Sequence, residues 1–180
     1  MQLAISYWQM VLFISAIWVT VRAACWTRAK AINIKRELQL LLVYICLIVV
    51  VRFTFCPFGT VDGKIQPLLF DSEKIWPFWV NFLPFVYWFD YPTLKEALLN
   101  LIGNTLMFLP LGIVWPAVFW QLNTHGKVIG AGFGVSLTIE ILQLPFFGRS
   151  TDIDDLILNT LGFLLGYGIY LLVRKGKRKC

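Results

Sequence analysis

Five stretches of the chain are long and apolar enough to predict helices that cross a lipid bilayer. Such a helix needs about 20 mostly apolar residues. The stretches are Leu3–Val21, Leu38–Cys56, Leu98–Trp120, Val128–Phe147 and Leu156–Val173. The first lacks the basic start of a secretory signal peptide, so we interpret it as a retained span. The pattern predicts an all-α, polytopic membrane bundle of about five transmembrane helices.

The composition agrees with a membrane protein and excludes two other classes. Of the 180 residues, 58% are hydrophobic and 14% are charged, whereas a soluble domain carries roughly 25% charged residues. The 16% of aromatic residues exclude a disordered chain, because disordered chains are poor in aromatics. The 4 cysteines show no metal-binding or disulfide spacing, so we expect free thiols.

The basic residues predict how the chain is oriented in the membrane. The net charge is +6, and most lysines and arginines lie in two short tracts beside apolar stretches, at residues 22–37 and 174–180. This distribution is typical of cytoplasmic loops and argues against a nucleic-acid partner. Five spans place both tracts on one side. We therefore expect a multi-pass protein with its N-terminus outside the cell and its C-terminus in the cytoplasm.

The connection between the second and third spans, residues 57–97, differs from an ordinary loop. It is rich in Trp, Phe and Tyr and is interrupted by prolines. Because such aromatic side chains favour the headgroup level of a bilayer, we expect a re-entrant or interfacial segment at the outer leaflet. The alternative is a sixth, short span at Ile75–Phe89, which would separate the two basic tracts onto opposite sides.

We expect one membrane domain over residues 1–180, without internal repeats. Its predicted parts are two transmembrane helices, the outer segment, a three-helix core and a basic cytoplasmic tail, at residues 1–56, 57–97, 98–173 and 174–180. Glycines at helical spacing predict close packing in the core, because small residues let helix backbones approach. They form two stripes, Gly126, Gly130 and Gly134 in the fourth span and Gly162 and Gly166 in the fifth.

Polar side chains gather near the outer ends of the last three spans, where the predicted topology brings them together. The candidate ligand-binding cluster consists of Asn100, Asn104, Ser136, Glu140, Gln143, Arg149, Asp152, Asp154, Asp155 and Asn159. Helical spacing places Ser136, Glu140 and Gln143 on one face of the fourth span. A charged side chain inside the hydrocarbon costs at least ~2.5 kcal/mol, so Glu140 is a functional candidate by default.

Two interpretations of this cluster stay open. It could be a clasp that joins the three spans, with Glu140 paired to Arg149, or the clasp could also line a cleft for a ligand. The three aspartates could hold a divalent cation. Capping the start of the last helix explains them better, so we expect no metal and no cofactor. The single histidine, His125, falls on the opposite side, which argues against a Ser–His or Cys–His pair in the cluster.

These polar residues resemble the conserved pattern of the VanZ family, whose founding member is linked to teicoplanin resistance. The similarity covers roughly Asn81 to Tyr167. It runs through Val80-Asn81-x-x-Pro84-Phe85, Asn100, Asn104-x-x-x-Phe108-x-Pro110-x-Gly112, Ser136-x-x-Ile139-Glu140-x-x-Gln143 and Arg149-x-x-Asp152-x-Asp154-Asp155-x-x-x-Asn159-x-x-Gly162-x-x-x-Gly166. The resemblance implies a bacterial cell-membrane protein of the envelope that sometimes confers tolerance to lipoglycopeptide antibiotics.

The leading functional hypothesis is a non-enzymatic envelope protein whose outer cleft binds a lipid-linked ligand or a lipid headgroup and thereby affects glycopeptide tolerance. The expected partners are membrane lipids, lipid-linked cell-wall precursors or lipoglycopeptides, and a second copy of the chain in a homo-oligomer. One alternative is a membrane enzyme that acts on lipid or cell-wall intermediates, with Glu140 and an aspartate as acid and base. Another is a small oligomeric transporter or flippase.

Overall fold

The structure, a computed structural model, describes residues 2–29, 31–56, 60–61, 63–75, 80–85, 93–122, 124–149 and 151–177. Most of this part of the chain is helical. The α-helices are α1 (Tyr7–Arg28), α2 (Ile34–Phe55), α3 (Leu94–Val118), α4 (His125–Gln143) and α5 (Ile153–Lys177). The predicted helical membrane bundle is confirmed, because α1, α2, α3 and α5 are long and apolar enough to cross a bilayer.

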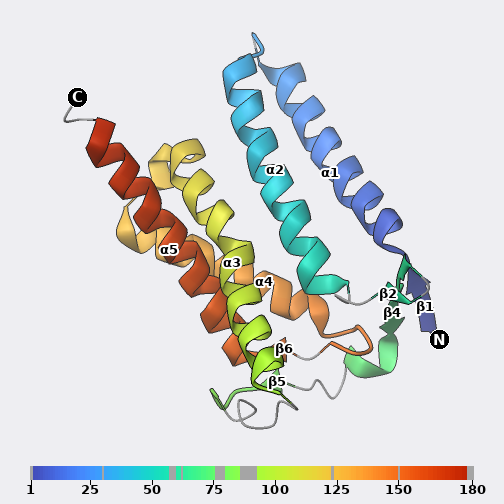
Figure 1. Cartoon of the computed structure of the whole chain (residues 1–180). Coiled ribbons are helices and arrows are strands. Elements are labelled where there is room, and N and C mark those ends of the chain that lie inside the picture. The colour runs from blue at the N-terminus through green and yellow to red at the C-terminus, as the bar shows by residue number, and fades with distance from the viewer. Residues whose placement is uncertain are drawn as a thin grey trace.

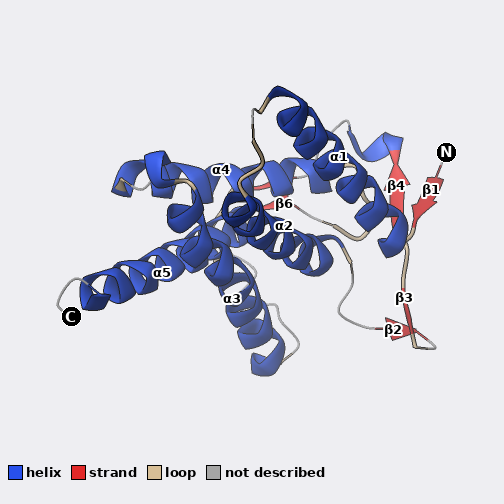
Figure 2. Ribbon diagram, turned by 90° about the horizontal axis from the view of Figure 1, so that it is seen from above, coloured by secondary structure: helices blue, strands red, loops and turns tan. Residues whose placement is uncertain are grey.

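The fourth predicted span, Val128–Phe147, corresponds to α4, which differs from the other helices in composition and direction. Its 19 residues include Lys127, Glu140 and Gln143, and it is not among the helices apolar enough to qualify as a span. The other four helices run between the same two ends of the bundle, whereas α4 passes behind α3 and α5 at a steep inclination to them (Figure 1). Seen from above, α4 extends across the bundle (Figure 2).

Each of the first three helices begins at a cap, a few residues away from the start that hydropathy predicts. Ser6 forms a capping box with Gln9, so α1 begins at Tyr7 and the predicted start at Leu3 is wrong. Asn33 and Thr93 likewise cap α2 and α3, whose first turns are too polar to register in a hydropathy profile. Within the described residues Cys25, Cys46 and Cys56 are free thiols, as expected.

The strands are short and lie near one end of the bundle, hereafter the strand-bearing end (Figure 1). They form three pairs: β1 (Gln2–Ile5) antiparallel to β4 (Leu68–Asp71), β2 (Thr60–Val61) antiparallel to β3 (Lys64–Ile65), and β5 (Val80–Asn81) parallel to β6 (Thr151–Asp152). The pairing of β1 with β4 is the reason why Gln2–Ile5 is extended instead of helical.

The long connection between α2 and α3 is described only in part. Its described pieces are the short strands, a 3₁₀ helix η1 (Ser72–Ile75) and a turn up to Phe85. The aromatic residues at 76–79 and 86–89, on which the interfacial interpretation depends, lie outside the described residues. The alternative sixth span at Ile75–Phe89 also lies partly outside them, and the described portion at 80–85 is a strand and a turn instead of a helix.

Glycines set the distance between α3 and α5. A Cβ atom added at Gly162 would overlap the carbonyl oxygen of Thr105 and lie 2.8 Å from its carbonyl carbon. Gly166 meets the backbone of Leu109 in the same way. The packing role predicted for Gly162 and Gly166 is therefore confirmed, and the backbones of α3 and α5 approach as closely as glycine permits. Behind this contact lies the apolar core, with Phe108 fully buried.

The predicted packing stripe on α4 is wrong for contacts within this chain. A Cβ atom added at Gly126, Gly130 or Gly134 would have no atom of the described residues within 4 Å. The glycine of α4 that does pack is Gly132, where an added Cβ would lie 2.8 Å from the Phe163 ring. The buried face of α4 follows Val128, Gly132, Ser136 and Glu140 at steps of four, so Gly126, Gly130 and Gly134 lie on another face of the helix.

Candidate functional site

A polar cavity of about 200 Å³ lies between α2, α3, α4 and α5, toward the strand-bearing end. Its lining residues are Phe53, Thr54, Asn100, Asn104, Glu140, Gln143, Gly148, Arg149, Asp155 and Asn159. Seven members of the candidate cluster are among them. The structure brings these seven together and places Ser136, Asp152 and Asp154 outside the lining. Hydropathy gave no signal for Thr54, because one hydroxyl in an apolar span is common.

Side-chain hydrogen bonds join α5 to α3 and, separately, to α4 around the cavity. Asn104 donates through Nδ2 to the Asp155 carboxylate and, at 3.4 Å, to Oδ1 of Asn100. One turn further along α5, Asn159 donates to the Ser136 hydroxyl at 3.1 Å. Asn100 and Asn104 are four residues apart on α3, as are Asp155 and Asn159 on α5, so the side chains of each pair lie on one helix face. Ser136 is fully buried behind the cavity, where it fixes the Asn159 amide.

Asn159 has one polar atom with no partner. Its side chain is 1% exposed, and its Oδ1 atom accepts no hydrogen bond from any described residue. Because the amide has only one bonded partner, turning it over would leave its nitrogen unpaired instead. A buried polar group without a partner costs about 1–3 kcal/mol. This residue lines the cavity, so a bound donor there would remove that cost.

Glu140 is 2% exposed and is held from the start of α5. Its Oε2 atom accepts the backbone N–H of Asp152 at 3.3 Å, and its backbone carbonyl accepts the Thr151 hydroxyl at 2.8 Å. The expected pairing with Arg149 is wrong. Among the described residues the ion pair that forms joins Arg22 of α1 to Glu37 of α2.

Arg149 instead closes the end of α2. Its Nε and Nη2 atoms donate to the carbonyl oxygen of Phe55 at 3.2 and 2.9 Å. Gln143 donates to the preceding carbonyl, that of Thr54, at 2.5 Å. The last carbonyls of a helix have no partner within the helix, so a buried helix end needs such donors. Burial lowers the pKa of the Arg149 guanidinium, while the Asp155 carboxylate acts in the opposite direction.

Asp152 and Asp154 attach the connection between α2 and α3 to the start of α5. Asp152 accepts the side-chain amide of Asn81 at 3.1 Å and the backbone N–H of Asp154 at 3.0 Å, so it caps α5 as predicted. Asp154 is 8% exposed and accepts the backbone N–H of Phe85 with both carboxylate oxygens, at 3.0 and 3.1 Å. Together with the β5–β6 pairing, these contacts bind the turn at Phe85, whose φ angle is +62°.

The arrangement of the aspartates does not favour the cation alternative. Asp152 and Asp154 accept hydrogen bonds from the segment 80–85, and Asp155 accepts one from α3. Within the part of the chain that the structure describes, no group of three His, Cys, Asp or Glu side chains could hold a metal ion. The cavity lining contains no serine, cysteine or histidine. His125 begins α4 and packs against the Tyr167 ring at 5.6 Å between centroids.

Comparison with known proteins now connects this cavity with a family. The sequence model of the VanZ/LLP1 family matches residues 41–174, which include α3, α4 and most of α2 and α5. The chain belongs to the VanZ/LLP1 family. This confirms the VanZ resemblance and extends it beyond the stretch from Asn81 to Tyr167, so that the α2 end of the cavity lies inside the matched region.

Two relatives show how much of this family's sequence is shared. Protein VanZ of Enterococcus faecium is 38% identical over 76 residues, which are 42% of this chain and 47% of that protein. The uncharacterized membrane protein YwnJ of Bacillus subtilis (strain 168) is 31% identical over 88 residues, or 48% of this chain and 59% of that protein. The chain thus spans about half the length of the curated relatives it matches. No solved structure matches the chain. The apolar helices and these relatives together make it a membrane protein of the VanZ/LLP1 family.

Proposed function

We propose that this VanZ/LLP1-family protein binds a lipid headgroup or the polar part of a lipid-linked ligand in the cavity, without turnover, and thereby affects teicoplanin tolerance. The observation that carries the proposal is the unpaired, fully buried Oδ1 atom of Asn159 in a cavity of about 200 Å³. A clasp alone needs no open space and no free acceptor. The link to teicoplanin rests on the family resemblance.

The lining predicts the chemistry of the ligand. Glu140 and Asp155 provide carboxylate oxygens and Asn159 provides a free acceptor, so the ligand should carry hydroxyl or ammonium donors. Arg149 uses two nitrogen atoms on Phe55, and a guanidinium has five N–H donors, so others can meet a phosphate or carboxylate. A polyhydroxyl or zwitterionic headgroup has both features.

The cavity volume limits the size of the ligand. Sites for drug-sized molecules measure roughly 300–1,000 Å³. At about 200 Å³ this cavity fits a headgroup, whereas an acyl chain or a whole lipoglycopeptide must stay outside. The proposal therefore does not place teicoplanin in the cavity. Instead the protein binds a membrane-anchored molecule that teicoplanin also contacts. A membrane enzyme or a transporter would need turnover or flux in addition to binding.

The test uses a variant that changes the cavity charge with little change in shape. Asp155→Asn keeps an oxygen that can accept from Asn104 but removes one carboxylate from the lining. Glu73→Gln, an exposed acid in η1 outside the cavity, is the matched control. We expect Asp155→Asn to lose teicoplanin tolerance in an expressing host at normal abundance of folded protein, and Glu73→Gln to behave as wild type. If tolerance follows folded abundance on one line, the cavity is structural and the proposal is wrong.

Native mass spectrometry of the purified full chain separates the mechanisms. The probes are phosphatidylglycerol, phosphatidylethanolamine and an undecaprenyl-linked cell-wall precursor, each added to detergent-solubilised protein. The proposal expects a one-to-one adduct with one class that weakens in Asp155→Asn. A chemically altered headgroup after incubation would instead establish an enzyme, and flux across liposomes would establish a transporter.

We also propose that the strand-bearing end faces the cell exterior and that the opposite end, where the α1–α2 turn and the end of α5 lie, faces the cytoplasm. The α1–α2 turn and the end of α5 lie at the same end of the bundle, as the distribution of basic residues requires (Figure 1). In a cysteine-free background, Asp71→Cys should react with an impermeant maleimide on intact cells, and Lys175→Cys only after permeabilisation. Reaction of both on intact cells would refute this orientation.

A further inference from the structure

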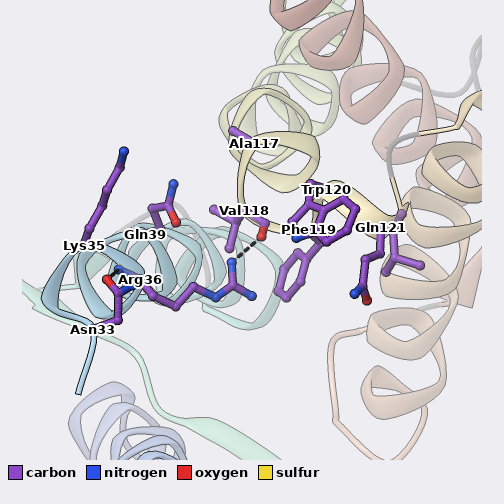
Figure 3. A pocket seen from close by; sticks show the side chains of 10 residues that line it. Asn33, Lys35, Arg36, Gln39, Ala117, Val118, Phe119, Trp120 and Gln121 are labelled. Carbon is purple, nitrogen blue, oxygen red and sulfur yellow. Dashed lines mark hydrogen bonds between the residues drawn. The ribbon is translucent and has the colours of Figure 1, made fainter. Parts of the chain in front are cut away.

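A second hollow lies at the opposite end of the bundle, between the first turns of α2 and the end of α3. This basic groove has a volume of about 640 Å³ and is lined by Asn33, Lys35, Arg36, Gln39, Ala117, Val118, Phe119, Trp120, Gln121 and Leu122. The last three form the 3₁₀ helix η3 (Trp120–Leu122). Figure 3 shows the side chains of α2 on one side and those of the α3 end and η3 on the other.

Arg36 crosses this groove, and two contacts hold its guanidinium in place. Its Nη1 atom donates to the carbonyl oxygen of Val118, the last residue of α3 (Figure 3). Its guanidinium also lies over the Phe119 ring, 5.5 Å from the centroid. The last turn of α3 has no basic residue of its own, so Arg36 supplies the positive charge that a helix end favours. The hydrogen bond to Val118 uses one of the five N–H donors of the guanidinium, and the remaining N–H groups can bind a ligand.

The charges around the groove are unbalanced. No Asp or Glu is among its lining residues, although Lys35 and Arg36 are. The adjacent acid, Glu37, is occupied elsewhere, because Arg22 donates to it at 2.9 and 2.5 Å. A third cation lies next to the groove, since Lys127 donates through Nζ to the Gln121 carbonyl at 3.2 Å. The groove therefore concentrates positive charge that the described residues do not neutralise.

The position of the groove selects the partner. It lies where two candidate membrane spans end, and Trp120 is 69% exposed at this level. Exposed tryptophan at the end of a span favours the headgroup layer of the bilayer. Basic pockets between transmembrane helices are suited to anionic lipid headgroups. We propose that the basic groove binds the headgroup of an anionic phospholipid through Lys35 and Arg36. This inference is independent of the polar cavity and of its proposed ligand.

The test compares two charge-removing variants at the same end of the bundle. Lys35→Gln/Arg36→Gln removes the two cations of the groove, and Arg174→Gln/Lys175→Gln removes two exposed cations of α5 outside it. Phosphatidylglycerol is titrated into the purified full chain and the adducts are measured by native mass spectrometry, with phosphatidylcholine as the neutral lipid. Each cation that contacts the anionic headgroup contributes roughly fivefold in affinity, so the groove variant, which loses two such cations, should bind roughly 30-fold more weakly.

The control variant should keep the wild-type affinity, and phosphatidylcholine should bind neither better nor worse in any variant. Equal losses in both double variants would show that the attraction is general, and an unchanged groove variant would show that the lipid binds elsewhere. Either result overturns the proposal. Displacement of the lipid by millimolar inorganic phosphate would also overturn it, since it would identify a small-anion site.

Arg36 also holds the end of α3, so its loss could unfold that end. Lys35→Gln alone keeps the test decisive, because it leaves the hydrogen bond from Arg36 to Val118 in place. Lys35→Gln should lose several-fold in affinity at unchanged melting temperature, and a wild-type affinity would count against the proposal.

Discussion

Gly162→Ala should destabilise the protein because the backbones of α3 and α5 touch at this point. The added Cβ would lie 2.8 Å from the carbonyl carbon of Thr105, and still closer to its oxygen, whereas ordinary contact begins at 3.4 Å. The helices must therefore separate by at least 0.6 Å, the difference between these two distances. A backbone carbonyl cannot rotate away as a side chain can, so the strain falls on the helix pair.

The magnitude follows from two opposing terms. Overpacking of this kind costs typically 1–3 kcal/mol, and the backbone contact places Gly162→Ala near ~3 kcal/mol. Alanine is favoured over glycine in a helix by about 1 kcal/mol, which leaves a net loss of about 2 kcal/mol. For a chain of this size that is a decrease in melting temperature of roughly 4–8 °C.

The assay is thermal unfolding in detergent, with Gly130→Ala as the matched control. A Cβ at Gly130 has no atom within 4 Å, so only the helix-propensity term remains and the melting temperature should rise by roughly 2–4 °C. The two substitutions are chemically identical and should shift the melting temperature in opposite directions. If Gly162→Ala stabilises the protein as much as Gly130→Ala does, the close contact between α3 and α5 does not exist in solution.

Four further substitutions test contacts near the strand-bearing end. Arg149→Lys should lower stability by about 1–3 kcal/mol, because lysine cannot make two parallel hydrogen bonds to the α2 carbonyl. Combined with Glu140→Gln, its effect should be additive within about 0.5 kcal/mol in thermal unfolding, and a clear departure would mean that the two residues do interact. Ser6→Ala should cost about 1 kcal/mol by removing the α1 cap, which the same melting assay detects. Asp154→Asn should release the Val80–Phe85 segment and speed its cleavage in limited proteolysis, and an unchanged cleavage rate would contradict the attachment.

Hydropathy alone determined most of the membrane architecture, because transfer into a bilayer depends on the sum over a local window of residues. The five helices lie close to the five apolar stretches. The exceptions have local causes, since the start of α1 depends on a capping box and on the pairing of β1 with β4. For α4 the sequence predicted a helix but not its inclination, which is a property of its packing against α5 and the core.

Helical spacing also placed most of the polar cluster correctly in space. Residues four apart on one helix share a face whatever the tertiary structure is, so Asn100 with Asn104, and Asp155 with Asn159, were predictable neighbours. The close approach of α3 and α5 was likewise readable from Gly162 and Gly166, because few other patterns allow backbones to touch. The functional role of the cluster stays a prediction until the binding and tolerance experiments are done.

Only the tertiary structure decided which polar groups bond to one another. Sequence proximity and opposite charge favoured a Glu140–Arg149 pair, yet Arg149 bonds to Phe55, 94 residues away. Arg36 bonds to Val118 across 82 residues, in a groove that no local pattern indicates. The physical reason is that the free energy of apolar burial depends on the total area buried and little on exact atom positions. A hydrogen bond, in contrast, requires two atoms within about 3 Å of each other in a narrow range of angles. That condition depends on the relative placement of whole helices, which exists only after they have packed.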